Sequence, residues 1–313
     1  MSFLSIITKL FGGLAVLIWA SHLLLKTADD VIAKFRLSPI FIGMTVIAIG
    51  TSLPEICVSF SSAYIGQYDV CLSNILGSNL FNAGFILGSC LCIRSISLDK
   101  RTLLGQLGIN VLVAFLLACF LWKNGQLMVV ACLVLLVLFY IYLKIAYHKN
   151  PDVVVPVATR EISLGRILFC FVACLPMFYF SSRWVTLGAL DLASWLNVSN
   201  AFIGFTVIAT GTSLPELVTG IIATLKRRND FIIGNVFGSN ICNICMGLGL
   251  VGFVFPLKTQ QLFYLRLQLF MHFIFALVAI AFAFKKVLSR FVGVLFVVTY
   301  MAIVWILYYY NPA

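Results

Sequence analysis

Glu55 and Glu216 stand inside apolar stretches long enough to cross a membrane, and they are two of only three glutamates in the chain. Each ends the same six residues, Gly-Thr-Ser-Leu-Pro-Glu, at 50–55 and at 211–216. The copies lie 161 residues apart (216 − 55 = 161). A carboxylate in hydrocarbon costs roughly 2.5 kcal/mol or more even on a lenient insertion scale. Its paired placement, each time beside hydroxyls and a helix-breaking proline, predicts a cation site.

The hexapeptide supplies oxygen ligands and weakens its own helix. Proline has no N–H, so Pro54 leaves the carbonyl oxygen of Gly50 without its usual helical partner. At membrane depth such a carbonyl is tolerated where it lines a polar cavity, and a bound cation is a suitable partner. A four-residue spacing places Thr51 and Glu55 on one helix face. A carboxylate, two hydroxyls and main-chain oxygens are therefore offered by Ala48, Thr51, Ser52 and Glu55, and again by Ala209, Thr212, Ser213 and Glu216.

A polar stripe with a spacing of four residues follows each hexapeptide. Its members are Asn74, Ser78 and Asn82 in the first copy, and Asn235, Ser239 and Asn243 in the second. If the copies face each other, the site contains two carboxylates, four amides and six hydroxyls. These hard oxygen donors favour Na⁺ or Ca²⁺ over zinc or copper. Asn79 and Asn240 fall off the stripe, and we interpret them as structural.

The composition indicates an integral membrane protein, because 62% of the residues are hydrophobic and 10% are charged, against about 25% charged in soluble domains. Apolar runs of about 20 residues mark candidate spans. Ten such runs lie at approximately 5–25, 38–64, 70–93, 103–122, 126–147, 164–182, 197–225, 231–255, 261–284 and 289–310. The first is long enough to span, so we expect a transmembrane helix there rather than a cleaved signal peptide. The ten cysteines lie mostly within these runs, and we expect free packing residues rather than disulfides.

An internal repeat organises the chain. Residues 38–88 and 199–249 align without gaps at an offset of 161 and are identical at 22 of 51 positions. The register implies five spans in residues 1–147 and five in residues 164–313, joined by a cytoplasmic linker at 148–163. Because five is odd, the halves enter the membrane in opposite orientations. We predict an all-α integral membrane fold of ten transmembrane helices as two inverted-topology five-helix repeats, an arrangement common in secondary transporters.

The net charge of +11 is explained by the membrane topology rather than by binding to a nucleic acid. Basic residues collect in cytoplasmic loops. The loops after spans 1, 3, 5, 7 and 9 hold 16 of the 21 lysines and arginines, and the remaining five fall on the other side. This asymmetry predicts that both termini lie outside and that the 148–163 linker is cytoplasmic. We expect no nucleic-acid binding.

With both motifs in view, the chain resembles the calcium/cation antiporter superfamily, in particular its prokaryotic sodium/calcium exchanger-like proteins. The likeness is most specific at 43–88 and 204–249, which look like that family's paired α-repeats, each with GTSLPE followed by GSN-x-x-N. The resemblance implies a helical core from spans 2, 3, 7 and 8 and exchange of Ca²⁺ for Na⁺ by alternating access at a midplane site. We also expect a prokaryotic cytoplasmic membrane, no cofactor and no obligate protein partner.

Carried over position by position, the resemblance implies twelve ion ligands. They are Ala48 and Ala209 through their carbonyl oxygens, and Thr51, Ser52, Glu55, Ser78, Asn82, Thr212, Ser213, Glu216, Ser239 and Asn243 through their side chains. Some members of the family have an aspartate at one of the last stripe positions. Both Asn82 and Asn243 are amides here, so the site holds two formal negative charges, and the coupling ion and the stoichiometry stay open.

Three other functions remain as alternatives. The first is a cation antiporter on the same scaffold driven by H⁺ or K⁺, in which Glu55 or Glu216 would bind the driving proton. The second is a passive cation channel, which the inverted repeat with broken helices disfavours. The third is an intramembrane enzyme, but the sequence contains no His-Glu-x-x-His or Gly-x-Ser-x-Gly motif, so we expect no catalysis.

Overall fold

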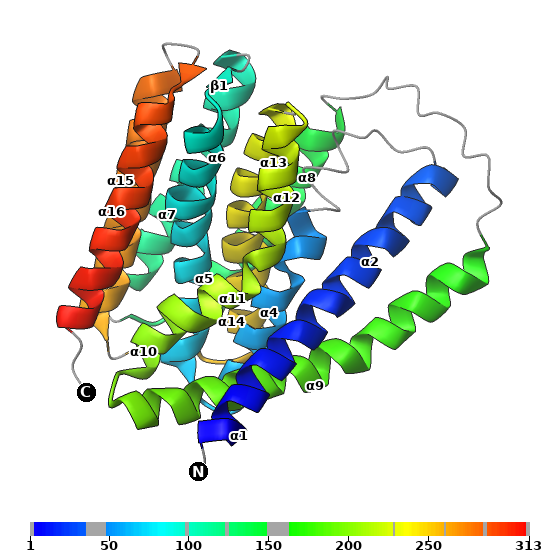
Figure 1. Ribbon diagram of the computed structural model, residues 1–313, viewed down its shortest axis with the longest axis vertical. Helices are drawn as coiled ribbons and strands as arrows, with labels where there is room; N and C mark the ends of the chain where they lie inside the picture. The colour runs from blue at the N-terminus through cyan, green and yellow to red at the C-terminus, as the bar shows by residue number, and fades with distance from the viewer. Residues whose placement is uncertain are drawn as a thin grey trace.

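The computed structural model describes residues 3–35, 48–97, 100–122, 125–148, 163–227, 229–259, 261–283 and 287–310, nearly all in helices (Figure 1). Within these ranges, seven helices are long and apolar enough to cross a membrane. A bent pair, Asn200–Thr212 with Leu214–Leu225, makes an eighth span if its two parts are counted together. The predicted all-helical membrane architecture is therefore confirmed, whereas the count of ten helices stays a prediction.

The elements follow one another in two series, in which η marks a π-helical segment. The first comprises α1 (Phe3–Ile7), η1 (Thr8–Gly12), α2 (Gly13–Phe35), α4 (Ala48–Tyr64), α5 (Tyr68–Leu80), η3 (Phe81–Ile86), α6 (Leu87–Ile93), β1 (Ile96–Ser97), α7 (Lys100–Leu121) and α8 (Val129–His148). The second comprises α9 (Leu164–Leu196), α10 (Asn200–Ile203), η4 (Gly204–Ile208), α11 (Ala209–Thr212), α12 (Leu214–Leu225), α13 (Asn229–Ile241), η5 (Cys242–Leu248), α14 (Gly249–Val254), α15 (Leu262–Ala283), β2 (Val287–Leu288) and α16 (Arg290–Tyr309).

Two predicted spans are longer in the structure than in the sequence analysis. The span predicted at 5–25 continues as helix to Phe35, and the span predicted at 164–182 continues to Leu196. The polar residues that end each apolar run do not break a helix, because neither extension contains proline and charged side chains are compatible with helical geometry. Helix α9 ends at Leu196, and the next residue, Asn197, adopts a left-handed conformation with φ 55°. Residues 38–47 of the second predicted span lie outside the described residues.

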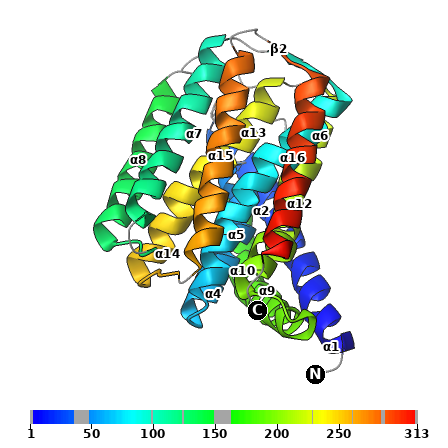
Figure 2. The same cartoon turned by 90° about the vertical axis from the view of Figure 1, so that its left-hand side faces the viewer.

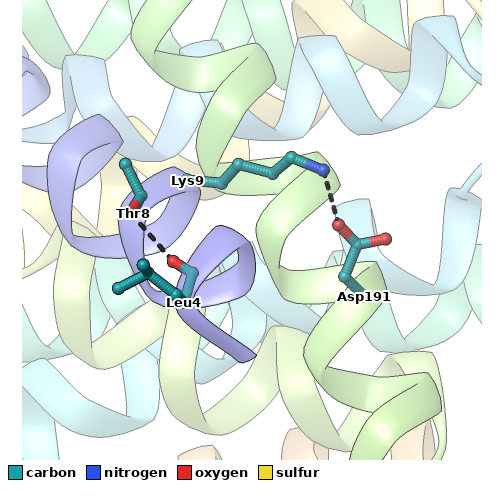
Figure 3. A network of polar contacts seen from close by, with 4 residues as sticks. All are labelled: Leu4, Thr8, Lys9 and Asp191. Carbon is teal, nitrogen blue, oxygen red and sulfur yellow. Dashed lines mark hydrogen bonds and ion pairs between the residues drawn. The ribbon is translucent and has the colours of Figure 1, made fainter. Parts of the chain in front are cut away.

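The two long helices α2 and α9 lie side by side and run obliquely along one flank of the molecule (Figures 1 and 2). Their shared core contains small and branched side chains such as Leu17, Ala20 and Val185. Near the start of the chain, Lys9 of η1 forms an ion pair with Asp191 of α9 over 2.8 Å, beside the hydrogen bond from Thr8 to the Leu4 carbonyl (Figure 3). This ion pair joins η1 to α9 near the start of the chain.

We expect the Lys9–Asp191 pair to contribute little to stability. Both side chains are partly exposed, 30% for Lys9 and 19% for Asp191, and such pairs are typically worth about 1 kcal/mol or less. Thermal unfolding of the detergent-solubilised protein should show a small loss for Lys9→Gln and for Asp191→Asn. The melting temperature of the double variant should be no lower than that of the less stable single variant. Strictly additive losses would show that the two charges do not interact.

The centre of the bundle is formed by the helices that carry the repeated motifs. In an 18-residue apolar stretch of Tyr68–Ile93 and of Ile232–Val254, 83% of the residues are buried, against 33% in a stretch of the same length in each of the peripheral helices α8 and α16. Large apolar side chains such as Ile75, Ile86 and Phe205 fill this centre. The polar stripes therefore lie on the most enclosed elements of the fold.

Short main-chain bridges connect the two series at positions that follow the repeat. Strand β1 pairs antiparallel with β2, with Ser97 opposite Val287. An isolated antiparallel bridge joins Gln126 to Lys258. In the repeat, Ser97 corresponds to Lys258 (97 + 161 = 258) and Val287 corresponds to Gln126 (287 − 161 = 126). The two bridges therefore join equivalent positions of the two halves. Helix α1 begins and α16 ends at the same end of the molecule in both views (Figures 1 and 2).

Candidate cation-binding site

The twelve predicted site residues are all buried, although they come from several helical segments of both repeats. The first hexapeptide lies in α4, and the second extends from α11 into α12. The stripe serines lie in α5 and α13, and the stripe asparagines that follow them lie in the π-helical segments η3 and η5. Single π-helical turns are frequent at functional sites because they re-aim side chains within a helix.

The two identical hexapeptides adopt different backbone geometries. Helix α4 runs without interruption from Ala48 through Pro54. In the second copy, Ser213 leaves the helical region at φ −87° and ψ 10°, and the segments on either side are bent by 47°. We expected the proline to disturb both copies, and among the described residues only the second is broken. Since the six residues are the same, the surrounding packing and not the local sequence decides this difference.

The two carboxylates are tied to each other's motif by serine hydroxyls. Ser213 donates to Glu55 Oε1 over 2.7 Å, and Ser52 donates to Glu216 Oε1 over 3.4 Å. Ser239 also lies 3.5 Å from Glu216 Oε1. Each glutamate thus accepts a hydrogen bond from the serine that stands three positions before the other glutamate. The motifs of the two halves meet in one buried cluster, as the sequence predicted.

The alanine carbonyls and threonines complete the contact between the halves. Ser78 donates to the Ala209 carbonyl oxygen over 3.4 Å, and Thr212 donates to the same oxygen over 3.3 Å. Thr51 lies 3.4 Å from the Ala48 carbonyl oxygen and 3.5 Å from the hydroxyl of Ser239. The serine of each stripe therefore contacts the other half, and carbonyl and hydroxyl oxygens lie beside the carboxylates.

The first asparagine of each stripe fastens the helix that carries the glutamate. Asn74 Nδ2 donates to the main-chain carbonyl oxygen of Glu55 over 3.0 Å, and Asn235 Nδ2 donates to that of Glu216 over 3.3 Å. The same Asn74 nitrogen also lies 2.9 Å from the Ser59 hydroxyl. From their spacing, the sequence predicted only that these asparagines share the polar stripe. In the structure, they donate to main-chain carbonyl oxygens of the helices that carry the glutamates.

Several buried oxygens of this cluster have no hydrogen-bond partner among the described residues. They are Glu55 Oε2, Glu216 Oε2, Asn82 Oδ1, Asn235 Oδ1 and Asn243 Oδ1. Buried polar atoms without partners are rare in proteins and are expensive. No described lysine or arginine forms an ion pair with either glutamate. Buried acceptor oxygens that meet no donor, two of them on carboxylates, are suited to a cation.

The donor set fits a hard cation rather than a transition metal. Nowhere in the described ranges do three or more His, Cys, Asp or Glu side chains gather in a way that could hold a metal ion. The ten cysteines, including Cys242 and Cys245 beside the site, are free thiols. Two carboxylates balance one divalent charge, and amide, hydroxyl and carbonyl oxygens are the usual remaining ligands of Ca²⁺.

The carboxylate of Asp69, close to the site in sequence, has an ordinary structural role. Asp69 stands in the first turn of α5, where Thr259 donates a hydrogen bond to its carboxylate. A carboxylate in the first turn of a helix is stabilised by the helix dipole. Its counterpart in the repeat, Asp230, lies in the first turn of α13.

Comparison with known proteins extends the likeness over nearly the whole chain. A family profile described as sodium/calcium exchanger protein matches residues 6–148 and 166–309. The chain is 33% identical to the inner membrane protein YrbG of Escherichia coli, over 86% of both chains. It is 26% identical to the sodium/calcium exchanger MaX1 of Methanosarcina acetivorans, over 95% of this chain and 97% of that protein.

A solved structure has the same fold. The sodium-calcium exchanger NCX_Mj, in crystals soaked with Na⁺ and Ca²⁺, matches with a TM-score of 0.67 and 27% sequence identity over 100% of both chains. Both hexapeptides and both stripes fall inside the ranges that the family profile matches. Apolar spanning helices, the paired motifs and these matches agree, and the chain is a multi-pass integral membrane protein that belongs to the sodium/calcium exchanger family of cation antiporters.

Proposed function

We propose that this protein exchanges Ca²⁺ for Na⁺ across the membrane at the cluster around Glu55 and Glu216. The observation that carries the proposal is the pair of buried glutamates, each with one carboxylate oxygen that has no partner among the described residues. The names of MaX1 and NCX_Mj, both sodium/calcium exchangers, support the same pair of ions. One Ca²⁺ neutralises both carboxylates, and Na⁺ ions compete for the same oxygens.

The energetics of the cluster explain why transport in each direction requires an ion. Without a cation, two carboxylates stand uncompensated in a low-dielectric interior, and this state is expensive. Either Ca²⁺ or Na⁺ removes the penalty, so the loaded forms cross between the two access states more easily than the empty form. Competition for one site, together with a costly empty state, produces exchange rather than leak.

An inverted repeat supplies the two access states. We infer ten transmembrane helices in two halves, 1–147 and 164–313, joined by the 148–163 linker. The offset that relates the Ser97–Val287 bridge to the Gln126–Lys258 bridge supports this arrangement. Identical hexapeptides in two geometries also support it, because a site between two halves changes access when the halves exchange conformations. The long helices α2 and α9 then slide along the core to open either side.

We place the protein in a prokaryotic cytoplasmic membrane with both termini outside. The excess of basic residues in alternate loops supports this orientation, and the name of YrbG, an inner membrane protein, supports the location. Figure 1 shows α1 beginning and α16 ending at one side of the bundle, which an even number of crossings requires.

A second candidate is the same exchange driven by H⁺ or K⁺ instead of Na⁺. The observation in its favour is the pair of amides at Asn82 and Asn243, which leaves the cluster with two carboxylates only. A carboxylate that has no basic partner is also a binding place for a proton.

Ion-dependent flux in proteoliposomes tests both candidates. Uptake of radioactive Ca²⁺ is measured after loading the vesicles with Na⁺, with K⁺ or at a different pH, with protein-free vesicles as the control. We expect uptake with internal Na⁺ and only background uptake with the other two gradients. Uptake with a pH step alone, at the level of the Na⁺ arm, would replace the sodium proposal with the proton-linked one. Equal uptake without any counter-ion would indicate a channel.

A further inference from the structure

Asn79 and Asn240 lie between the two stripes and connect the halves directly. Both are fully buried. Asn79 Nδ2 donates to the main-chain carbonyl oxygen of Asn240 over 3.1 Å, and Asn240 Nδ2 donates to that of Asn79 over 3.2 Å. The residues are equivalent in the repeat (79 + 161 = 240). Spacing placed them outside the stripe, but the structure places them in contact with its last members.

Each of these asparagines also accepts a hydrogen bond from a stripe asparagine of the other half. Asn243 Nδ2 donates to Asn79 Oδ1 over 3.0 Å, and Asn82 Nδ2 donates to Asn240 Oδ1 over 3.0 Å. Four amides thus form a closed, reciprocal arrangement across the interface between the halves. The side-chain pairs cross between the halves: Asn79 accepts from Asn243, and Asn240 accepts from Asn82.

The main chain fixes the direction of every hydrogen bond in this arrangement. A main-chain carbonyl oxygen only accepts, so the atom of Asn79 that meets it must be the amide nitrogen. The remaining atom, Asn79 Oδ1, is then an acceptor. Asn243 must present its own NH₂ group to that oxygen, and the same reasoning applies to Asn240 and Asn82. The amide orientations at Asn82 and Asn243 are therefore set from the backbone outward.

The consequence is that both stripe asparagines have their carbonyl oxygens left over. Asn82 Oδ1 and Asn243 Oδ1 are buried and have no partner among the described residues, like one carboxylate oxygen of Glu55 and one of Glu216. Asn82 and Asn243 follow Ser78 and Ser239 by four residues, and these serines contact the Ala209 carbonyl oxygen and Glu216 Oε1. Had either amide turned over, a donor NH₂ group would take the place of the oxygen. A donor repels a cation, so the orientation decides whether these residues bind an ion or exclude it.

We propose that Asn79 and Asn240 are positioning residues that hold Asn82 and Asn243 as neutral oxygen ligands and so determine which ions the site accepts. The inference rests on the proposed exchange of Ca²⁺ for Na⁺ and adds the residues that orient two of its ligands. It also explains why position 243 holds an amide in this chain. An ionised aspartate there has no hydrogen to donate and would set its oxygen against Asn79 Oδ1.

Double-mutant cycles on the purified full-length protein test the crosswise pairing. Alanine replaces Asn79, Asn243, Asn82 and Asn240 singly, in the two partner pairs (79 with 243, and 240 with 82) and in the two control pairs (79 with 82, and 240 with 243). The readouts are the apparent KM for Ca²⁺ and for Na⁺ in proteoliposomes, and the rise in melting temperature that Ca²⁺ produces in detergent. Losing one buried hydrogen bond should raise the KM for Ca²⁺ about fivefold to tenfold.

The expected result is strong non-additivity in the partner pairs and near-additivity in the control pairs. Once Asn79 is removed, the further loss of Asn243 should raise the KM by less than about twofold, because the amide orientation is already lost. Additive effects in the partner pairs, or equal coupling in all four pairs, would overturn the proposal. If the wild type shows ion-induced stabilisation but no Na⁺-dependent uptake, the proposed exchange fails and the cycles in the stability readout still decide the orientation.

A second variant covers the case in which the alanine variants at 79 or 240 do not fold. Asn243→Asp keeps the size and the oxygen of the side chain and removes only the donor. We expect the KM for Ca²⁺ to rise, although the substitution adds an acidic group to a cation site, because the new carboxylate oxygen is set against Asn79 Oδ1. An unchanged KM for Ca²⁺, or a fall of about tenfold, equivalent to about 1.4 kcal/mol, would show that the donor to Asn79 does not govern position 243, and would overturn the role given to Asn79.

Discussion

Replacing either buried glutamate by glutamine should abolish Na⁺-dependent Ca²⁺ uptake. Glu55→Gln and Glu216→Gln keep the size of each side chain, and the Ser213 and Ser52 hydroxyls keep an oxygen to which they can donate. Each removes one of the two negative charges that neutralise Ca²⁺. Loss of one member of a buried charged group costs about 3–5 kcal/mol, which corresponds to a fall of about a hundredfold or more in apparent affinity.

The glutamate variants also predict a change in the ion-free protein. Without a cation, the wild type holds two uncompensated carboxylates in its interior, so removing one should make the ion-free protein more resistant to heat. Ca²⁺ should then raise the melting temperature of the wild type and should scarcely change that of either variant. A single variant that is more stable without ions and unresponsive to Ca²⁺ would identify the carboxylates as the ion ligands rather than as packing residues.

Asp191→Asn provides the matched control for this experiment. It removes a carboxylate charge from a residue of α9 that pairs with Lys9 outside the cluster. Uptake by this variant should remain within about twofold of the wild type, since partly exposed ion pairs contribute about 1 kcal/mol or less. Wild-type uptake in both glutamate variants would contradict the proposed site.

A methyl group at Gly77 should disrupt the site through the backbone. Gly77 of α5 lies against η4 and α11, and a Cβ atom there would stand 2.7 Å from the Phe205 carbonyl oxygen and 2.9 Å from the Ala209 Cβ. Main-chain atoms cannot yield as the end of a flexible side chain does, so the helices must separate. Overpacking of this kind costs about 1–3 kcal/mol. The adjacent Ser78 would lose its contact with the Ala209 carbonyl oxygen.

We therefore expect Gly77→Ala to lower both the melting temperature and the rate of exchange. The comparison is Gly105→Ala on α7, because a Cβ atom at Gly105 would meet nothing within 4 Å. Alanine favours helix over glycine by up to about 1 kcal/mol, so this control should be as stable as the wild type or more so. Thermal unfolding and Ca²⁺ uptake of both variants check the prediction. Equal behaviour of the two would contradict the close packing of α5 against η4.

The repeat made much of the site predictable because it presents the evidence twice. A single glutamate in an apolar run has several explanations, but the same hexapeptide at an offset of 161 residues, followed by the same stripe, indicates two halves of one site. All twelve predicted residues are buried. The lengths of α2 and α9 were less predictable, since a polar residue ends an apolar run without ending a helix.

The sequence by itself determined that this chain is a helical membrane protein with a doubled set of oxygen-bearing residues, because composition, spacing and repetition are properties of the chain alone. Only the tertiary structure decided that Ser213 donates a hydrogen bond to Glu55 and that Asn243 donates one to Asn79, because these contacts join residues 158 and 164 positions apart. It also decided that one hexapeptide stays helical while its identical copy breaks at Ser213. Identical local sequences have identical local preferences, so the difference between them comes from the packing that surrounds each copy.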